Sequence, residues 1–250
     1  MLLKLYYKFF KTVFNGDCTV YDRYRWLSRY LPPTNDNHNL LDIGCGNGTS
    51  LFLASEKGYE SRGITWSQND KNKIYEKINL INPINNIDVL VQDVREINNL
   101  KLPKFNIITC TETIEHIIDE KKLIQNISNL LVDKGLLFLT TPNFFFKFKD
   151  KDEDGPFTKD FEDGNHVVRG YTFAYLEKVL KKNKMVIVNR HYITGPLSKF
   201  LLKISRKLNS KFFKPLWILL TIIFHFFDII LSKNNDANYS IGIIAQKFED

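Results

Sequence analysis

The sequence has few cysteines, and they do not form a recognisable cluster. Cys18, Cys45 and Cys110 are the only three in 250 residues, and no two of them make a CxxC pair. This spacing disfavours a disulfide scaffold and a cysteine-ligated zinc site, and it indicates a reducing, cytoplasmic setting. Internal repeats are also absent. With 44% hydrophobic and 25% charged residues, the composition is that of a globular chain.

A secretory leader is not expected either. The first residues contain several lysines and no small-residue cleavage site. Three lysines share one side of residues 2–14, opposite Leu, Tyr and Phe side chains, and this pattern predicts a basic amphipathic helix. We expect a single domain over residues 1–250, in which residues 1–30 form an N-terminal amphipathic helix or lid.

No hydrophobic run is long enough to predict a transmembrane helix. The longest, residues 216–231, is interrupted by His225 and Asp228. At ~1.5 Å per residue it measures about 24 Å, which is shorter than the ~30 Å hydrocarbon core of a bilayer. It forms the second half of a basic and hydrophobic helical insertion at residues 196–235, which precedes the last predicted strand.

Basic charge is concentrated in this insertion. The chain carries a net charge of +7, of which +6 lies between residues 196 and 233. Because the rest of the chain is nearly neutral, nucleic acid is a disfavoured partner. Lysines beside an apolar helix suit an anionic surface, so we expect Lys199, Lys203 and Lys207 to hold the insertion peripherally on the inner face of a membrane. Packing as a lid or as a homodimer interface is the alternative.

Apolar strands alternate with helical stretches from residue 39 to residue 193. This alternation is typical of an α/β fold whose mostly parallel sheet carries helices on both faces. The strand candidates are short and rich in Ile, Leu and Val, as strands buried on both faces require. We predict strands at residues 40–43, 61–65, 88–92, 106–110, 136–140, 185–191 and 240–247, and helices at 49–57, 69–79, 121–131 and 172–181.

A glycine-rich loop follows the first predicted strand. Asp42 lies near the end of that strand, and Gly44, Gly46 and Gly48 recur at every second position after it. Glycines at such a turn let backbone N–H groups approach a ligand at a helix N-terminus. A dinucleotide fingerprint would place its third glycine at position 49, which is a threonine here, so the loop does not fit NAD well.

The DIGCGNG stretch resembles motif I of the class I S-adenosylmethionine (SAM) methyltransferases. Four further segments match that family in order, at residues 91–94, 105–110, 133–143 and 166–176. The resemblance implies a Rossmann-like seven-stranded sheet with an antiparallel last strand, and SAM as the cofactor. It implies that Asp93 meets the adenine amino group. It also implies cofactor contacts by Asp42, Gly44, Cys45, Gly46, Gly48, Val94 and Cys110.

The second strand departs from the family pattern. Members usually end this strand with an acid that binds the ribose hydroxyls, whereas Thr65 stands there in this chain, and we expect Thr65 to be one of the cofactor contacts. A similar GIT segment occurs in cyclopropane-fatty-acid and mycolate-type methyltransferases, where polar groups slightly downstream reach the ribose. This likeness implies that Asp70 binds the ribose and that Trp66 covers the adenine. The alternative role for Asp70 is to charge the first turn of a helix.

Three chemistry-bearing side chains follow the fourth predicted strand. Glu112, Glu115 and His116 are spaced i, i+3, i+4, which on a helix places them on one face at the carboxyl edge of the sheet. Two carboxylates and an imidazole can hold Mg²⁺, Mn²⁺ or Zn²⁺. The ExxEH pattern resembles a metal site of small-RNA 2′-O-methyltransferases and quinone-pathway O-methyltransferases, and this likeness implies His166 as a further ligand.

A metal-free site is the alternative for the same residues. His116 then acts as a general base, and Glu115 orients its ring. Glu112 in that case faces the amino group of SAM.

These observations predict a SAM-dependent methyltransferase that acts on an oxygen or carbon of a hydrophobic or lipid-linked small molecule. An RNA 2′-O-methyltransferase is one alternative, although the catalytic face carries little basic charge. A non-catalytic SAM-fold adaptor for a membrane or protein partner is another, and the intact glycine loop together with Asp93 argues against it. The acceptor itself is not predicted, because acceptor pockets are built from variable loops.

Overall fold

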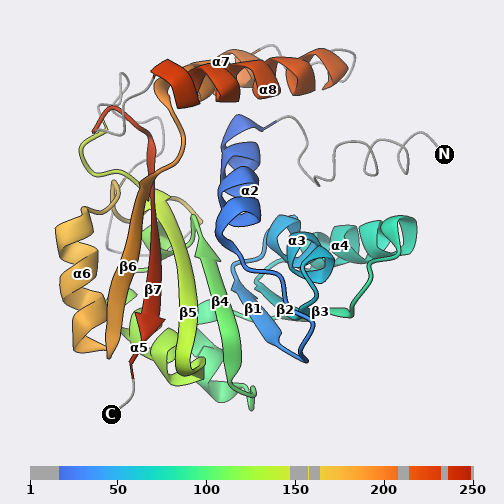
Figure 1. The fold of residues 1–250 in the computed structure, drawn as a ribbon, viewed down its shortest axis with the longest axis vertical. Helices are drawn as coiled ribbons and strands as arrows, with labels where there is room; N and C mark the ends of the chain where they lie inside the picture. Colours follow the sequence, from blue (N-terminus) through green and yellow to red (C-terminus); the bar gives the residue numbers. More distant parts are fainter. Residues whose placement is uncertain (1–16, 147–156, 158–163, 208–213, 232–235, 249–250) are drawn as a thin grey trace.

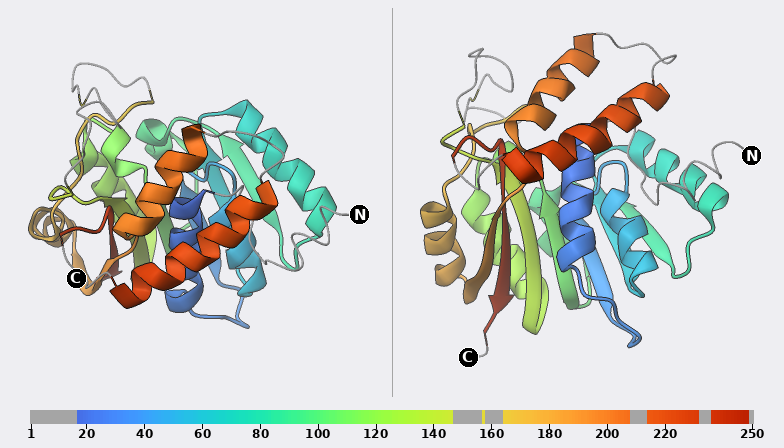
Figure 2. Two further views of the ribbon diagram at one scale, coloured as in Figure 1. Left: turned by 90° about the horizontal axis from the view of Figure 1, so that it is seen from above. Right: turned by 45° about the horizontal axis from the view of Figure 1, so that its top comes forward.

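The computed structural model describes residues 17–146, 157, 164–207, 214–231 and 236–248. The amphipathic helix predicted over residues 2–14 lies outside these ranges. Within them, the chain forms one sheet with helices on both faces and a pair of helices across one edge (Figures 1 and 2).

The sheet confirms the fold that the alternating pattern predicts. Its strand order is β3-β2-β1-β4-β5-β7-β6. Strands β1 to β5 are parallel, and β7 is antiparallel to both of its neighbours. The strands are β1 (Asn39–Ile43), β2 (Glu60–Thr65), β3 (Ile87–Val91), β4 (Phe105–Thr111), β5 (Leu131–Pro142), β6 (Met185–Tyr192) and β7 (Ser240–Lys247).

Alternate strand residues face two different helical layers, as the two-residue repeat of a strand requires. Leu40 and Phe138 pack with α2 and α3 on one face. Leu41 and Leu137 pack with α5 and α6 on the other face. The helices are α2 (Cys18–Tyr30), α3 (Thr49–Glu56), α4 (Gln68–Ile81), α5 (Glu120–Leu130) and α6 (Phe173–Lys182), with short 3-10 helices η1 (Val94–Asn99) and η2 (Ile114–His116).

Two elements differ in their bounds from what the sequence predicts. Helix α2 is the described part of the helix or lid predicted over residues 1–30, and it forms with Asp17 as its N-cap, whose carboxylate accepts hydrogen bonds from the Thr19 and Val20 backbone N–H groups. Strand β5 begins at Leu131, directly after α5, and not at residue 136. A tight turn at Lys134, where φ is 61°, lies inside this longer strand.

The insertion forms two helices, α7 (Pro196–Lys207) and α8 (Lys214–Leu231), between β6 and β7. We call this pair the α7–α8 hairpin. It lies across the carboxyl ends of the parallel strands, above α2 (Figures 1 and 2). Of the helices that the structure describes, none combines the length and the apolarity that crossing a bilayer requires.

Candidate active site

The glycine loop after β1 needs its glycines for two different reasons. The backbone φ angles of Gly44, Gly46 and Gly48 are 75°, 46° and 80°, which L side chains rarely adopt. A Cβ at Gly44 would overlap the Thr113 side chain, whereas a Cβ at Gly46 would meet no atom nearer than 4.0 Å. The Gly46 position therefore borders open space, which a ligand can occupy.

That space is a cavity of about 330 Å³ at the carboxyl edge of the sheet. Seven of the cofactor-binding residues predicted from the sequence line it, although they come from three separate segments of the chain. They are Gly44, Gly46, Thr65, Trp66, Asp70, Asp93 and Val94. Glu112 and His116 line the same cavity, so the two predicted groups of residues meet in one place.

Four other predicted cofactor residues lie behind the cavity wall. The Asp42 carboxylate is buried and accepts a hydrogen bond of 2.7 Å from Thr109 Oγ1, and burial raises its pKa to about 6. Cys45 packs against Gly63, where a Cβ would lie only 2.7 Å from the Cys45 Sγ. Gly48 is the N-cap of α3, and Cys110 is wholly buried in the core. The side chains of Asp42, Cys45 and Cys110 thus support the loop from behind.

The residues after β2 form one wall of the cavity. Trp66 is 76% exposed, and a Cβ on Gly164 would lie 3.9 Å from its ring. Thr65 Oγ1 accepts a hydrogen bond from the Ser67 backbone, and Ser67 Oγ accepts one from the Asp70 backbone. Asp70 thus lies in the first turn of α4 and also lines the cavity, so both roles considered for it are compatible with its place.

Asp93 has a partner that the sequence did not reveal. Its carboxylate accepts hydrogen bonds of 2.9 Å from Arg95 Nε and 2.9 Å from the Arg95 backbone, and the arginine lowers the pKa of this carboxyl group. A third of the side chain remains exposed, and Arg95 also lines the cavity.

Glu112 lies where the main cavity meets a smaller one of about 260 Å³. Its φ angle is 49°, a strained conformation for a residue other than glycine. Thr140 Oγ1 donates a hydrogen bond of 3.0 Å to its carboxylate, and Arg23 of α2 lies 3.9 Å from the other oxygen. Burial raises the pKa of Glu112, and Arg23 opposes this shift.

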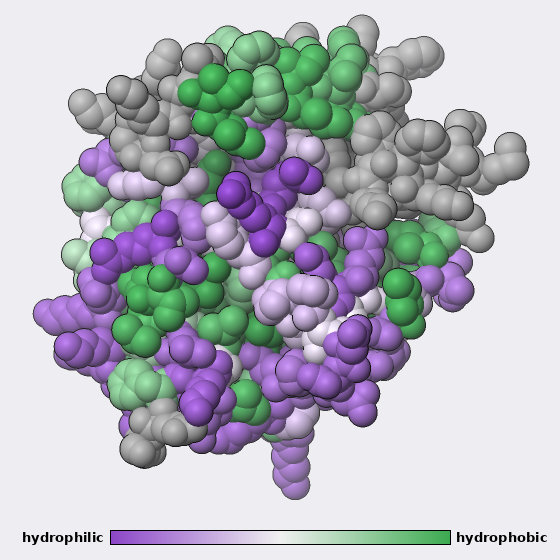
Figure 3. All heavy atoms as spheres, in the orientation of Figure 1, coloured by the Kyte–Doolittle hydropathy of each residue, from purple (hydrophilic) through white to green (hydrophobic). Residues whose placement is uncertain are grey.

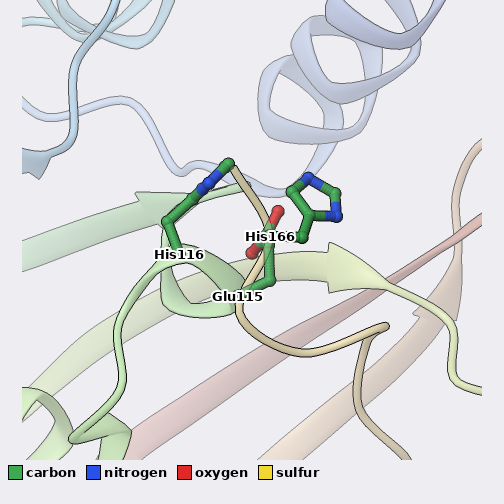
Figure 4. A group of neighbouring side chains, drawn as sticks. All are labelled: Glu115, His116 and His166. Atoms are coloured by element: carbon green, nitrogen blue, oxygen red, sulfur yellow. The ribbon is translucent and has the colours of Figure 1, made fainter. Parts of the chain in front are cut away.

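Glu115, His116 and His166 come together from two segments (Figure 4). Each offers one ligand atom, and these atoms all lie within 4.8 Å of one another. The two imidazole ring centroids are 4.7 Å apart. Glu115 is buried, with Oε2 accepting from Thr141 Oγ1 at 3.2 Å, and burial together with Glu112 raises the pKa of Glu115 well above its usual value.

Backbone contacts fix this arrangement. The Glu115 carbonyl accepts a hydrogen bond of 2.8 Å from the Val167 N–H, which holds the segment that carries His166. His116 Nδ1 donates to the Asn165 carbonyl at 3.1 Å. In the neutral ring this leaves the Nε2 lone pair available for a proton or a metal ion.

The helical spacing predicted for the ExxEH segment is wrong. Only the 3-10 helix η2 forms there, and Glu112 precedes it in a left-handed conformation, because its backbone N–H donates to the Thr140 carbonyl of β5. Glu112 is therefore outside the group of three possible metal ligands. Among the residues that the structure describes, the predicted four-ligand set reduces to Glu115, His116 and His166.

Sequence reasoning also missed three cations near the site. Arg23 and Arg95 pair with acids that were predicted, but no local pattern indicates either contact. Lys199 of α7 is 5% exposed, its Nζ lies 3.7 Å from the centre of the Tyr239 ring, and its charge, like that of Arg23, opposes the rise that burial causes in the pKa of Glu112. The prediction that Lys199 contacts a membrane is therefore wrong, because the side chain points inwards.

A glycine loop at the carboxyl edge of a Rossmann-like sheet, with acids near the ends of several strands, defines an α/β cofactor-binding protein. A family model described as a methyltransferase domain matches residues 18–183. The chain belongs to this methyltransferase domain family, and its fold is that of the class I SAM-dependent methyltransferases.

Individual relatives agree with this assignment. Ubiquinone biosynthesis O-methyltransferase of Coxiella burnetii is 30% identical over 114 residues, which are 44% of this chain and 45% of the relative. (S)-coclaurine N-methyltransferase of Thalictrum flavum subsp. glaucum is 26% identical over 195 residues, which are 74% of this chain and 52% of the relative. The chain thus spans about half the length of these curated relatives.

Solved structures show the same fold. Phosphoethanolamine N-methyltransferase 2 of Haemonchus contortus, in complex with SAM, has a TM-score of 0.61 and 16% identity. The match covers 92% of this chain and 53% of that one. At this identity the likeness concerns the fold alone.

Proposed function

We propose that this chain transfers a methyl group from SAM to an oxygen or carbon of a hydrophobic or lipid-linked small molecule. One observation carries the proposal: His116 both lines the glycine-loop cavity and belongs to the Glu115–His116–His166 group. The proton-accepting side chain therefore lies in the wall of the cofactor cavity. The O-methyltransferase name of the Coxiella relative favours oxygen as the acceptor atom.

The cavity residues fit SAM by shape and by charge. The open space at Gly46 gives the backbone room to approach a ligand, and Asp70 and Asp93 offer acceptors to hydroxyl and amino groups. Arg23 and Glu112 carry opposite charges beside the adjoining smaller cavity, which suits the carboxylate and the ammonium of a methionyl group. When bound, SAM supplies a methyl group that its sulfonium centre has already activated.

The protein then has to align the acceptor and take its proton. Alignment of two reactants lowers the activation free energy by about 7–11 kcal/mol. The bond from His116 Nδ1 to the Asn165 carbonyl directs Nε2 away from the backbone, where it can accept a hydroxyl proton. Such a general base contributes about 10²–10⁴-fold in rate. The buried Glu115 carboxylate stabilises the protonated ring.

The same three residues fit a divalent cation. Two imidazoles and one carboxylate are a ligand set for Zn²⁺ or Mn²⁺, and Glu115 Oε1 is a buried oxygen without a hydrogen-bond partner. A bound cation would offset the burial of this charge and would act as a Lewis acid on an acceptor oxygen. Asn165 would orient His116 in either case.

The surroundings of the site favour an apolar acceptor. Exposed aromatic side chains stand at the carboxyl edge: Trp66 after β2, and Phe144 and Phe145 after β5. A water-soluble acceptor gains little from such surfaces, whereas an isoprenoid or acyl chain buries them. We accordingly place the protein at a membrane surface, on its inner face, where lipid-linked molecules are concentrated.

Transfer of a labelled methyl group tests the proposal. Protein is incubated with SAM that carries tritium in the methyl group, together with a membrane lipid extract or with total RNA. We expect label in the lipid extract, and we expect His116→Ala to lower its appearance by about 10²-fold or more.

The matched control is His38→Ala, a change of the same type just before β1, away from the cavity. It should leave transfer unchanged. Label recovered in RNA and not in lipid would favour the RNA 2′-O-methyltransferase and contradict the proposal. SAM binding without transfer to either extract would favour the non-catalytic adaptor.

A further inference from the structure

Helix α8 has polar residues on its inner face, and its exposed face is apolar. Thr221, His225 and Asp228 share one face of the helix, and all three contact the rest of the protein. Thr221 Oγ1 contacts Cys18 Sγ at 3.4 Å, and His225 pairs with Asp22, both partners being on α2. Asp228 accepts hydrogen bonds from the first turn of α7. Water-soluble helices have the opposite arrangement.

The outer face of α8 is a continuous apolar stripe. Its members recur every three or four residues, which places them on one side of the helix. Phe226 and Ile230 are 58% and 59% exposed. Figure 3 shows apolar side chains gathered over the hairpin at the top of the molecule. The stripe, which we call the α8 stripe, consists of Leu216, Leu219, Ile223, Phe226, Phe227 and Ile230.

Positive charge surrounds the α8 stripe in the sequence. Most of the +7 net charge lies between residues 196 and 233, where Lys199 is buried. In the sequence, the other basic residues of this segment fall within α7, in the connection between the two helices, at the start of α8 and two residues after its end. They are Lys203, Arg206, Lys207, Lys211, Lys214 and Lys233.

We propose that the α8 stripe docks on the anionic surface of a lipid bilayer, with α8 lying in the plane of the headgroups. The helix runs across the carboxyl ends of the strands and is too short to span the membrane (Figure 1). The chain after it returns to β7, which lies between β5 and β6 inside the sheet, so both ends of α8 stay on the protein side. The docked face is then on the side of the molecule that carries the site.

Charge selects lipid over a second copy of the chain. A two-fold symmetric dimer through the α8 stripe would bring two segments of the same positive charge together, which is unfavourable. Anionic headgroups complement that charge, with a gain of about 1 kcal/mol per basic residue near the surface. This inference rests on the proposed function in one respect: the methyl acceptor is the molecule that the docked protein would reach at the bilayer.

Vesicle flotation with the full chain tests the α8 stripe. The probes are vesicles of phosphatidylcholine alone and vesicles that also contain phosphatidylglycerol. We expect wild type to float with the anionic vesicles, less so as salt rises. Ile230→Ser should weaken this partitioning by roughly 10-fold or more, because it removes an aliphatic side chain that the bilayer would bury on docking.

The matched control is Ile84→Ser, the same substitution at a residue that is 80% exposed and outside the hairpin. It should float like wild type. Equal flotation of the Ile84→Ser and Ile230→Ser variants would overturn the docking surface. A wild type that is dimeric in solution, with a monomeric Ile230→Ser variant, would assign the stripe to a second copy instead.

Charge is tested by two triple variants with the same loss of three positive charges. The affinity of the hairpin variant for anionic vesicles should fall on the order of 100-fold. The affinity of the control variant, which is changed at exposed lysines of α5 and α6, should stay as in wild type. Equal losses would contradict the charge argument. The two variants are Lys203→Gln with Lys207→Gln and Lys214→Gln, and Lys121→Gln with Lys122→Gln and Lys178→Gln.

SAM binding by calorimetry separates this inference from the proposed function. All four variants should bind SAM like wild type, because none of the substituted residues lines the glycine-loop cavity. A wild type that binds SAM but no vesicles would overturn the docking surface and leave the proposed function standing. Vesicle binding by a wild type that does not bind SAM would overturn the proposed function and leave the docking surface standing.

Discussion

Three carboxylates lie behind or beside the glycine-loop cavity, the buried Asp42 and Glu115 and the partly buried Glu112, and loss of solvent raises the pKa of each. A buried acid with a raised pKa lowers the stability of the folded chain at neutral pH. Several such acids on one edge of a sheet are typical of a functional site, where charge is kept for a ligand at the expense of stability.

Asp42→Asn should stabilise the protein and flatten its pH dependence. The pKa of Asp42 rises from 3.8 to about 6 on folding, so the folded state binds more protons than the unfolded state between these values. The free energy of unfolding therefore falls as pH rises through this window, and at neutral pH the full cost of about 3 kcal/mol remains. Denaturant unfolding of both proteins at pH 4 and pH 7 measures it. An equal pH dependence in the two proteins would contradict the assignment.

The three-ligand group makes a prediction about metal. Zn²⁺ or Mn²⁺ should raise the melting temperature of wild type, with about 2.7 kcal/mol of stabilisation at a hundredfold excess over Kd. His166→Ala and Glu115→Gln should abolish the increase, whereas Glu112→Gln should keep it, because Glu112 lies outside the group. Thermal unfolding with and without metal measures this. An increase that survives His166→Ala would rule out the three-ligand site.

At the scale of elements, α7 and α8 depend on each other through one buried acid. The Asp228 carboxylate accepts hydrogen bonds of 3.0 and 2.7 Å from the Leu197 and Ser198 backbone N–H groups. Gly195 permits this approach, because a Cβ there would overlap the carboxylate. An acid of one helix thus caps the first turn of another, which is a tertiary contact that neither helix sequence predicts.

Asp228→Ala should loosen the hairpin and leave the sheet intact. Loss of such a cap costs about 0.5–2 kcal/mol. Hydrogen exchange should accelerate in α7 and remain unchanged in β5. Asp236→Ala, at an acid that accepts from the Tyr192 hydroxyl outside the hairpin, should leave α7 protected. Unchanged exchange in α7 of Asp228→Ala would show that the cap contributes nothing.

The sequence predicts the elements whose signals are local. The strands are short runs of buried apolar residues, and the glycine loop follows from the need for positive φ angles. The sequence therefore predicts most strand bounds to within one or two residues, and it predicts the glycine loop directly. The ExxEH segment misleads because the bond from Glu112 to the Thr140 carbonyl overrides its helical spacing. Arg23 and Lys199 reach the site from elements far away in sequence, and no local pattern indicates such contacts.

At the scale of the whole molecule, one edge of the sheet carries the cavity and the histidine group, and the hairpin lies across the same edge (Figure 1). In a parallel sheet the carboxyl ends of the strands meet at this edge, so residues from distant segments gather there. A membrane on the hairpin side and a cofactor cavity beneath it would let a lipid-linked acceptor reach the site without passing through water.

The central claim is that the glycine-loop cavity binds SAM, and titration calorimetry of the purified chain with SAM tests it most directly. We expect one SAM per wild-type chain and no measurable binding by Gly46→Val, whose side chain would enter the space that the cavity leaves open. Ala174→Val, at an exposed position of α6 outside the cavity, serves as the control and should retain binding. A wild type that does not bind SAM, or a Gly46→Val variant that binds it with wild-type affinity, would contradict the account.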